Sequence, residues 1–270
     1  MNDLVTIDIN SAGVADVRLN RPDKYNALSP AMFDAITDAG ESLLDDKSVR
    51  AVVISGNGRG FCAGLDFSGF RSMAGDTDGS TGEARRKSTG RTPGNAAQQP
   101  GMVWKKLPVP VIAAIHGVAY GGGFQIAMGA DIRIATADAR FSVMEIKWGL
   151  IPDCSLTQTL RDLVRLDIAK ELTFTARRIG GEEAVGIGLA THCVDDPLAA
   201  ATELAEEIAT KSPSAVRAAK KLLTRAYSAD PIEGLKLEEG IQRTLLGSAN
   251  QMEAVKANME KRIPEFEDVE

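Results

Sequence analysis

One local pattern occurs twice in this chain and limits its fold more than any other feature. An apolar run is followed by a glycine-rich loop and then by a stretch with helical spacing, first at residues 50–70 and again at 109–130. Short apolar runs that end in glycine are typical of buried strands, and their alternation with helices indicates an α/β fold. The repetition predicts a spiral of β-β-α units.

The N-terminal region carries the local signals of a hairpin and a helix. Apolar and polar residues alternate at 4–10 and 14–20 on either side of a short turn, which predicts two short strands. Ser29 followed by Pro30 has the form of a helix N-cap with proline in the first turn. Helical apolar spacing over 31–44 predicts the helix that follows.

The chain divides by its periodicity into two parts. Strand and helix signals alternate up to residue 196, whereas the rest shows helical spacing without strand signals. We therefore expect residues 1–196 to form the spiral core, with the binding and catalytic residues, and residues 197–270 to form a helical oligomerisation domain with amphipathic helices. The segment 75–101 is rich in glycine, serine and threonine, which predicts a surface loop with little fixed structure.

Composition excludes several classes of function. The net charge of −6 argues against a nucleic-acid-binding surface, which is normally basic. No apolar run approaches the roughly 18 residues of a membrane span, and no signal peptide is evident, so a cytoplasmic protein without membrane insertion is expected. The cysteines, Cys62, Cys154 and Cys193, lie far apart and outside any Cys/His cluster, which predicts neither a disulfide nor a metal site. With only two histidines, acid–base chemistry is expected to rest on carboxylates.

Three consecutive glycines, residues 121–123, separate the second apolar run from its helix. The free N–H groups at a helix start, with the positive end of the dipole behind them, bind anions or stabilise a developing oxyanion. The simpler alternative is a tight strand-to-helix turn without a ligand, and the glycines alone do not decide between the two. The nucleotide-binding patterns GxGxxG and GxxxxGK[ST] do not follow the first strand, so phosphate loops of those types are not indicated.

Four segments, taken in chain order, carry a more specific resemblance. They read RPDKYNALS, RGFCAGLD, GVAYGGGFQIAMGADIRIA and ARFSVMEIKWGLIPD, and together they resemble the crotonase family, the enoyl-CoA hydratase/isomerase superfamily. The resemblance covers nearly the whole chain. It implies a β-β-α spiral with a helical trimerisation domain, an acyl-CoA thioester substrate, no cofactor beyond the coenzyme A that the substrate carries, and a homotrimer or dimer of trimers.

The resemblance also implies how the thioester is held. In that family two backbone N–H groups polarise the thioester carbonyl, and on this sequence they fall at Ala63 and Gly122. Removal of a proton beside a thioester creates an enolate, whose oxygen needs hydrogen-bond donors that are already in place. Residues that the resemblance places along the coenzyme A path are Lys24, Asn26, Leu28, Asp66 and Gly121.

Two positions twenty residues apart bear on the proton chemistry. Hydratases of the family resemble one another in having a glutamate at each. Glu145 matches the second position, and its apolar neighbours Met144, Ile146 and Trp148 can raise its pKa; a plain surface glutamate is the alternative. Gln125 stands at the first position, where an amide can form hydrogen bonds but cannot transfer a proton at neutral pH. The two-glutamate arrangement for adding water is therefore incomplete.

Asp153 offers a second carboxylate eight residues after Glu145. The dienoyl-CoA isomerase branch has aspartate there, although that branch also has an acid at the position of Gln125. The alternative is an N-cap for a helix beginning near Ser155. The sequence favours an isomerase that moves protons with Glu145 and Asp153. A hydratase that uses Glu145 and Gln125 is the first alternative, and a non-catalytic acyl-CoA-binding homologue is the second.

Overall fold

The computed structural model describes residues 4–66 and 90–269, and the largest sheet of this part has the strand order β1-β2-β3-β4-β6-β8. β1 is antiparallel to β2, and the later pairs in this sheet are parallel. β5 and β7 pair in a second, parallel sheet. The bounds are Val5–Ile9 (β1), Val14–Leu19 (β2), Ala51–Gly56 (β3), Val111–Ile115 (β4), Val118–Tyr120 (β5), Ile132–Ala135 (β6), Arg140–Ser142 (β7) and His192–Cys193 (β8).

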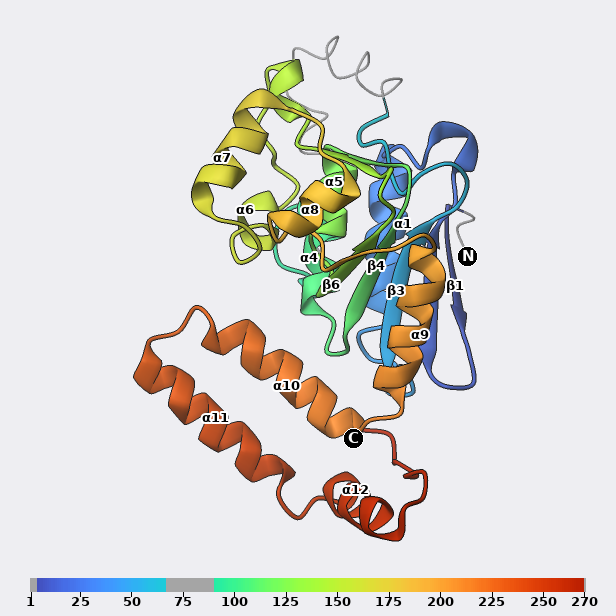
Figure 1. Cartoon of the computed structure of the whole chain (residues 1–270), viewed down its shortest axis with the longest axis vertical. Coiled ribbons are helices and arrows are strands. Elements are labelled where there is room, and N and C mark those ends of the chain that lie inside the picture. The colour runs from blue at the N-terminus through green and yellow to red at the C-terminus, as the bar shows by residue number, and fades with distance from the viewer. Residues whose placement is uncertain (1–3, 67–89, 270) are drawn as a thin grey trace.

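The chain alternates between the two sheets. From β4 it passes to β5 and α5, and then to β6 and β7. Parallel neighbours need such crossover connections, because the chain must return to the same end of the sheet. This arrangement confirms the predicted α/β spiral of β-β-α units (Figure 1). The shorter helical segments are η1 (Pro22–Lys24), α5 (Gly122–Ala127), η2 (Glu145–Trp148), α6 (Leu156–Thr159), α7 (Leu166–Thr175) and α8 (Gly181–Gly186).

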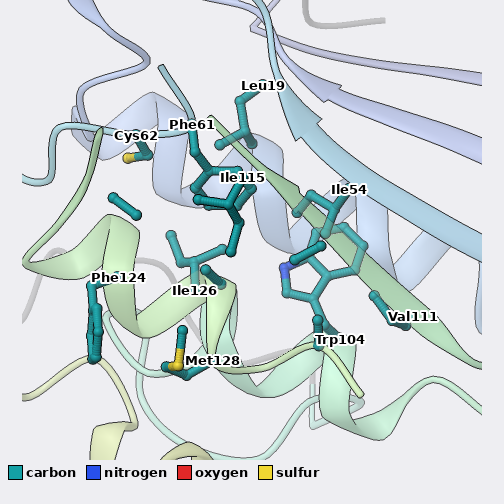
Figure 2. Packing of buried hydrophobic residues seen from close by; sticks show 14 of the residues in the cluster. Leu19, Ile54, Phe61, Cys62, Trp104, Val111, Ile115, Phe124, Ile126 and Met128 are labelled. Atoms are coloured by element: carbon teal, nitrogen blue, oxygen red, sulfur yellow. The ribbon is translucent and has the colours of Figure 1, made fainter. Parts of the chain in front are cut away.

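Apolar side chains are buried on both faces of the large sheet. On one face they pack with α1 (Pro30–Ser42), α4 (Gln99–Lys106) and α5, where Trp104 and Ile54 are fully buried (Figure 2). On the other face α9 (Pro197–Ala209) packs its alanines against β3, β4 and β6. All residues of β3 are buried, as expected for a strand covered on both sides.

The helical C-terminal region differs from its predicted boundary. α9, which begins at the predicted boundary, packs on the sheet as part of the core. The helices that extend away from the sheet in Figure 1 come after it. Helical spacing alone does not reveal this difference, because an amphipathic helix has an apolar face whether it covers a sheet or another subunit. These helices are α10 (Pro213–Ala226), α11 (Pro231–Leu245) and α12 (Ala249–Glu260).

Helix starts follow the capping signals of the sequence. The Ser29 hydroxyl accepts a hydrogen bond from the Met32 N–H at 3.3 Å, directly before α1. Asp196, Ser212 and Asp230 cap α9, α10 and α11 in the same way, and each precedes a proline. A side-chain acceptor followed by proline satisfies one free N–H and removes another. The predicted helix after Ser29 is therefore confirmed.

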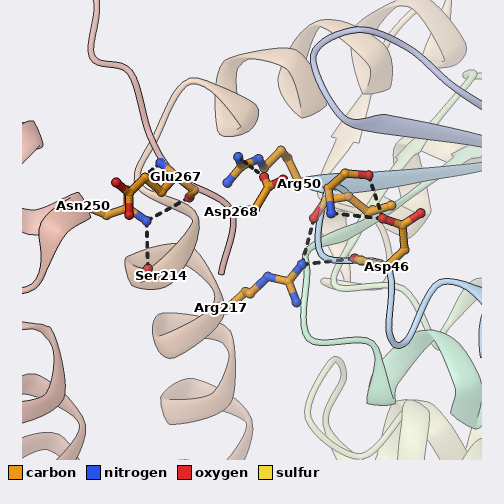
Figure 3. Close-up of polar contacts among 9 residues, drawn as sticks. Asp46, Arg50, Ser214, Arg217, Asn250, Glu267 and Asp268 are labelled. Carbon is orange, nitrogen blue, oxygen red and sulfur yellow. Dashed lines mark hydrogen bonds and ion pairs between the residues drawn. The ribbon is translucent and has the colours of Figure 1, made fainter. Parts of the chain in front are cut away.

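Polar contacts tie the C-terminal helices back to the core, as Figure 3 shows. The Arg217 guanidinium on α10 donates to the Val49 carbonyl at 2.9 Å. Arg50, just before β3, pairs with Asp268 near the C-terminus at 2.5 Å. The side-chain amide of Asn250 on α12 donates to the carbonyl of Glu267 and accepts from its N–H, in the same terminal segment. The end of the chain thus returns to the sheet although α11 extends away from it.

The predicted loop at 75–101 is only partly within the described residues, because 75–89 lie outside them. Its last part has fixed structure, against the prediction. α4 begins at Gln99, which is fully buried, and the Thr92 hydroxyl donates to Glu41 at 2.9 Å. The polar composition of 90–101 was misleading because the apolar residues that anchor this helix, Val103 and Trp104, come later in the chain.

Two general features of residues 4–66 and 90–269 bear on function. None of the helices there combines the length and apolar character needed to cross a bilayer. No group of three or more His, Cys, Asp or Glu side chains lies close enough there to hold a metal ion. Cys62, Cys154 and Cys193 are free thiols.

Candidate active site

The two glycine-rich loops predicted from the repeated pattern lie side by side. The Cys62 N–H donates to the Val118 carbonyl at 2.9 Å, and the Tyr120 N–H donates to the Cys62 carbonyl at 3.0 Å. Gly64 approaches Tyr120 so closely that an added Cβ would lie 2.6 Å from its carbonyl oxygen. The ends of β3 and β5 therefore bring both loops to one place.

Close contacts explain why the run has glycine at positions 121 and 122. Gly121 has a φ of 52°, and a Cβ there would lie 3.2 Å from Oε1 of Glu145. A Cβ on Gly122 would lie 2.7 Å from a methyl group of Leu28. Side chains at either position would displace Glu145 or Leu28, so glycine is required for close backbone approach.

The backbone donors predicted for the oxyanion differ in their availability. The Gly122 N–H, at the start of α5, has no acceptor among the described residues. The Ala63 N–H, in contrast, already donates to the Tyr25 carbonyl at 2.9 Å. Leu65 is the alternative in the same loop, because its N–H has no acceptor within the described part of the chain. An engaged N–H is a weaker candidate than a free one, so our proposal moves this role from Ala63 to Leu65.

Leu65 also has a suitable orientation. The Leu28 N–H donates to the Gly64 carbonyl, and the Asp66 N–H donates to the Leu28 carbonyl, at 2.7 and 3.0 Å. Residues that alternate along an extended segment point their backbone groups to opposite sides. The Leu65 N–H therefore points away from Leu28. Sequence reasoning missed this residue, because which N–H of the loop is free depends on carbonyl groups from elsewhere in the chain.

Gln125 and Glu145 form the central polar contact of the site. Gln125 lies on α5 and is fully buried, and its Nε2 donates to Oε1 of Glu145 at 2.6 Å. Its Oε1 accepts from the backbone N–H groups of Cys154 and Leu156 at 2.9 and 3.2 Å. The predicted pair is therefore brought together, but the carbonyl oxygen of Gln125 is occupied by the backbone and is not available to orient water.

Glu145 is placed as a proton-transfer group would be. It is the first residue of η2, directly after β7, and is half-buried. Burial raises the pKa of its carboxyl group, hydrogen bonds from its own backbone N–H and from Gln125 oppose that rise, and the charge of Asp153 adds to it. Oε2 is buried and has no hydrogen-bond partner among the described residues. A carboxyl oxygen without a partner is an exception among buried polar atoms, and a catalytic role is one explanation for it.

Asp153 lies near Glu145 without capping a helix. α6 begins at Leu156, and its N-cap residue is Ser155, whose side chain makes no capping bond. The one hydrogen bond that the described structure records for the exposed Asp153 carboxylate is a long contact of 3.7 Å from the Cys154 thiol. The N-cap alternative for Asp153 is therefore wrong. Its charge acts on Glu145, as the isomerase hypothesis requires.

The residues predicted along the coenzyme A path have different roles in the fold. Asn26 is fully buried, and its side chain bonds to the backbone of Arg21, Asn57, Gly60 and Phe61. Its side chain therefore supports the loop and is not exposed to a ligand. Lys24 is exposed on η1, whereas Leu28 is buried beside Gly122. A direct contact of coenzyme A with any of them stays a prediction.

Arg21 is a residue that sequence reasoning did not single out. Its guanidinium donates to the Ala27 carbonyl at 3.0 Å and pairs with the Asp66 carboxylate at 2.6 Å. The pair joins the segment before α1 to the first glycine-rich loop and neutralises Asp66. The signal was a basic residue at the start of RPDKYN, the segment already expected to contact coenzyme A.

Replacing Glu145 by glutamine is expected to stabilise the protein at neutral pH. Above the ordinary pKa of 4.5, the unfolded carboxyl group ionises before the folded one, because burial raises the folded pKa. The folded state then binds more protons, so the free energy of unfolding falls as the pH rises through this window. Glutamine removes that cost and can still accept the hydrogen bond from Gln125. Thermal unfolding should show a higher midpoint for Glu145→Gln at pH 7 and no gain below about pH 4.5.

The chain is similar to known proteins over almost its whole length. A family model described as enoyl-CoA hydratase/isomerase matches residues 9–269. The chain is 34% identical over 258 residues to the probable enoyl-CoA hydratase 2 of Arabidopsis thaliana, with 94% of this chain and 82% of that protein covered. It is 35% identical over 265 residues to the Delta(3,5)-Delta(2,4)-dienoyl-CoA isomerase of Mus musculus, with 95% and 80% covered. Both relatives are named as mitochondrial proteins, so a cytoplasmic location stays a prediction.

A solved structure gives the same result for the fold. The putative enoyl-CoA hydratase/isomerase from Mycobacterium abscessus superposes with a TM-score of 0.89 at 30% identity, covering 98% of this chain and 100% of that one. Similar identity to a hydratase and to an isomerase does not separate the two reactions. The match of the family model over almost the whole length, together with the paired glycine loops, confirms the resemblance found in the sequence. The chain belongs to the enoyl-CoA hydratase/isomerase family.

Proposed function

We propose that this protein is an isomerase that shifts double bonds in an enoyl-CoA or dienoyl-CoA thioester, with Glu145 and Asp153 as the proton-transfer groups. One observation carries the proposal: the carbonyl oxygen of Gln125 is held by two backbone N–H groups, and its amide binds Glu145. Position 125 therefore supplies no second acid or base. The carboxylate whose charge acts on Glu145 is that of Asp153.

In the proposed reaction each carboxyl group acts at a different carbon. The Asp153 carboxylate removes a proton from one end of the unsaturated chain, and the electron pair moves toward the thioester oxygen. The N–H groups of Gly122 and Leu65 stabilise the resulting enolate. Glu145, whose raised pKa favours its protonated form, returns a proton to the other end. Exchange with water resets both groups.

Two other functions make different demands on the same residues. A hydratase needs a group that activates water and a group that protonates the substrate; Glu145 alone would have to serve both, because Gln125 is engaged in the fold. A non-catalytic acyl-CoA-binding protein needs no carboxyl group with a raised pKa. Both alternatives therefore explain less of the geometry around Glu145 than an isomerase does.

The direct test compares two substrates with the purified protein. Turnover of a 3,5-dienoyl-CoA at a rate well above that of water addition to a short 2-enoyl-CoA supports the isomerase. The reverse ratio supports the hydratase. Binding of both thioesters, by calorimetry, without turnover of either supports the non-catalytic homologue.

We also propose that the protein assembles as a trimer or a dimer of trimers through its C-terminal helices. Apolar side chains on these helices are exposed, such as Leu235 at 64% and Ile232 at 66%, and a group of exposed apolar side chains is a feature of interfaces. A cavity of about 780 Å³ between α4, α10 and α11 is lined by Lys106, Lys221 and Arg225 among other basic residues, without an acidic one. In a chain of net charge −6, acidic segments of a second copy suit this surface. Light scattering at micromolar concentration should give at least three times the mass of one chain, and a stable monomer would contradict the proposal.

A further inference from the structure

Gln125 has a side-chain orientation that its neighbours fix without ambiguity. Its Oε1 lies 2.9 Å from the Cys154 nitrogen and 3.2 Å from the Leu156 nitrogen. Both nitrogens are backbone donors, and only the carbonyl oxygen of an amide can accept from them. The NH₂ group must then face Glu145. A reversed amide would instead place its NH₂ group against the N–H groups of Cys154 and Leu156, which are donors themselves.

This orientation favours one oxygen of Glu145 as the position of its proton. The Gln125 NH₂ group donates to Oε1 at 2.6 Å, and the unprotonated oxygen of a carboxyl group is the better acceptor, so the proton is favoured on Oε2. Oε2 has no partner in the part of the chain that the structure describes. We propose that Gln125 is a positioning residue, which reserves Oε1 of Glu145 as an acceptor so that Oε2 alone exchanges a proton with the substrate. The catalytic role of Oε2 rests on the proposed function, whereas the location of the proton does not depend on it.

The same side chain holds the segment that carries the second carboxylate. Its two backbone partners lie on either side of Ser155, which has a φ of 76°. A non-glycine residue in this region is strained and needs support from its surroundings. By bonding to both neighbours of Ser155, Gln125 fixes the turn that follows Asp153. One buried amide thus sets the positions of both proton-transfer groups.

A carboxylate at position 125 would keep the turn but lose the control of protonation. One oxygen of a glutamate there can still accept from the Cys154 and Leu156 N–H groups. Its other oxygen would face Oε1 of Glu145 across a contact of 2.6 Å, and two carboxylates at that distance share a proton. The proton would then lie between the two carboxylates and not on Oε2. This is a physical reason for an amide where hydratases of the family have an acid.

The charged groups around Glu145 are few enough for the effect to be measured. Asp153 is the charged residue that changes its pKa. Lys147, on the same 3-10 helix, lies over the Trp148 ring. α7 packs against this helix, and its Asp167 and Glu171 pair with arginines. Its Lys170 is exposed. Among the described residues, the side chains of α5 that face Glu145 are uncharged.

The test is a titration of the Glu145 carboxyl group by carbon-13 NMR, with glutamate labelled and the signal assigned by its absence in Glu145→Gln. Gln125→Met removes the donor to Oε1, and the apparent pKa should rise by about one unit, the size of one hydrogen bond to a charged group. Gln125→Glu should raise it further, because a shared proton leaves late. Gln125→Glu should nevertheless retain more thermal stability than Gln125→Met, since it keeps the backbone bonds.

Thr159→Val is the matched control for a purely structural role. The Thr159 hydroxyl is buried and bonds to the Ser155 carbonyl at 3.3 Å, so this variant loosens the same turn without touching Glu145. It should lower the unfolding midpoint and leave the titration of Glu145 unchanged. The proposal fails if the titration of Glu145 is unchanged in Gln125→Glu. It also fails if the pKa of Glu145 shifts in all three variants in proportion to their loss of stability.

Kinetics separate this inference from the proposed function. In Gln125→Glu the kcat for dienoyl-CoA isomerisation should fall, and its loss at alkaline pH should begin at a higher pH than in the wild type because the shared proton leaves late. KM should change little because Gln125 is fully buried. A wild-type protein that does not isomerise dienoyl-CoA refutes the proposed function, but the titration still tests the protonation of Glu145. An active enzyme whose titration does not move in either variant refutes the positioning role alone.

Discussion

Glu145→Gln is expected to lower acyl-CoA turnover by about 10²- to 10⁴-fold, the range typical of a lost general acid or base. Glutamine has nearly the same shape as glutamate and can accept the Gln125 hydrogen bond through its carbonyl oxygen. It cannot give or take a proton at Oε2. Steady-state kinetics should therefore show the loss in kcat, while calorimetry should show an almost unchanged Kd for the coenzyme A ester.

The control for this experiment is Glu182→Gln. Glu182 is exposed on α8, so its substitution makes the same chemical change at a distance from the site, and its kinetics should match the wild type. If Glu145→Gln turned over substrate at the wild-type rate, Glu145 would not be the proton-transfer group. Together with the expected gain in thermal stability, a loss of kcat would show a trade between stability and activity at this residue.

Asp153→Asn is expected to remove most dienoyl-CoA isomerisation and to have little effect on any hydration. One end of the proposed proton shuttle is lost, and a loss of about 10²-fold or more follows from removing a general base. The Asp153 carboxylate caps no helix, so the fold and the thermal midpoint should be preserved. The same charge raises the pKa of Glu145; its removal should lower that pKa and move the pH–rate profile to lower pH.

Asp138→Asn provides the comparison for this variant. Asp138 is exposed in the turn between β6 and β7, and its substitution removes one negative charge without touching the site. If Asp153→Asn isomerised a dienoyl-CoA as fast as Asp138→Asn does, Asp153 would have no part in the reaction. The isomerase proposal would then fail, and the remaining enzymatic hypothesis would be a hydratase in which Glu145 acts alone on a 2-enoyl-CoA.

Local signals in the sequence were sufficient for the elements of the fold. The alternating segments at 4–10 and 14–20 form β1 and β2, and the Ser29-Pro30 signal starts α1. Such features depend on residues close in the chain, whose spacing reflects the period of a strand or a helix. The repeated strand–glycine–helix pattern also predicted both glycine-rich loops, whereas their meeting depends on the backbone hydrogen bonds of Cys62 with Val118 and Tyr120.

The sequence was less informative where the answer depends on what an element packs against. The helical spacing of α9 gave no sign that it covers the sheet, and the polar composition of 90–101 hid the buried start of α4. The resemblance to the family placed a donor at Ala63, but whether an N–H is free depends on a carbonyl from elsewhere, here that of Tyr25. These are long-range contacts, which no local pattern records.

The chemistry of the site divides in the same way. The sequence by itself determined the residue types: a glutamate at 145, an aspartate at 153 and an amide at 125, and with them the class of acid–base chemistry that the chain can perform. Only the tertiary structure decided what each one does. It buries Gln125 against the backbone of Cys154 and Leu156, leaves Oε2 of Glu145 without a hydrogen-bond partner among the described residues, and frees Asp153 from capping. The pKa and the hydrogen-bonding capacity of a side chain depend on its burial and its neighbours, and those neighbours are brought together by folding.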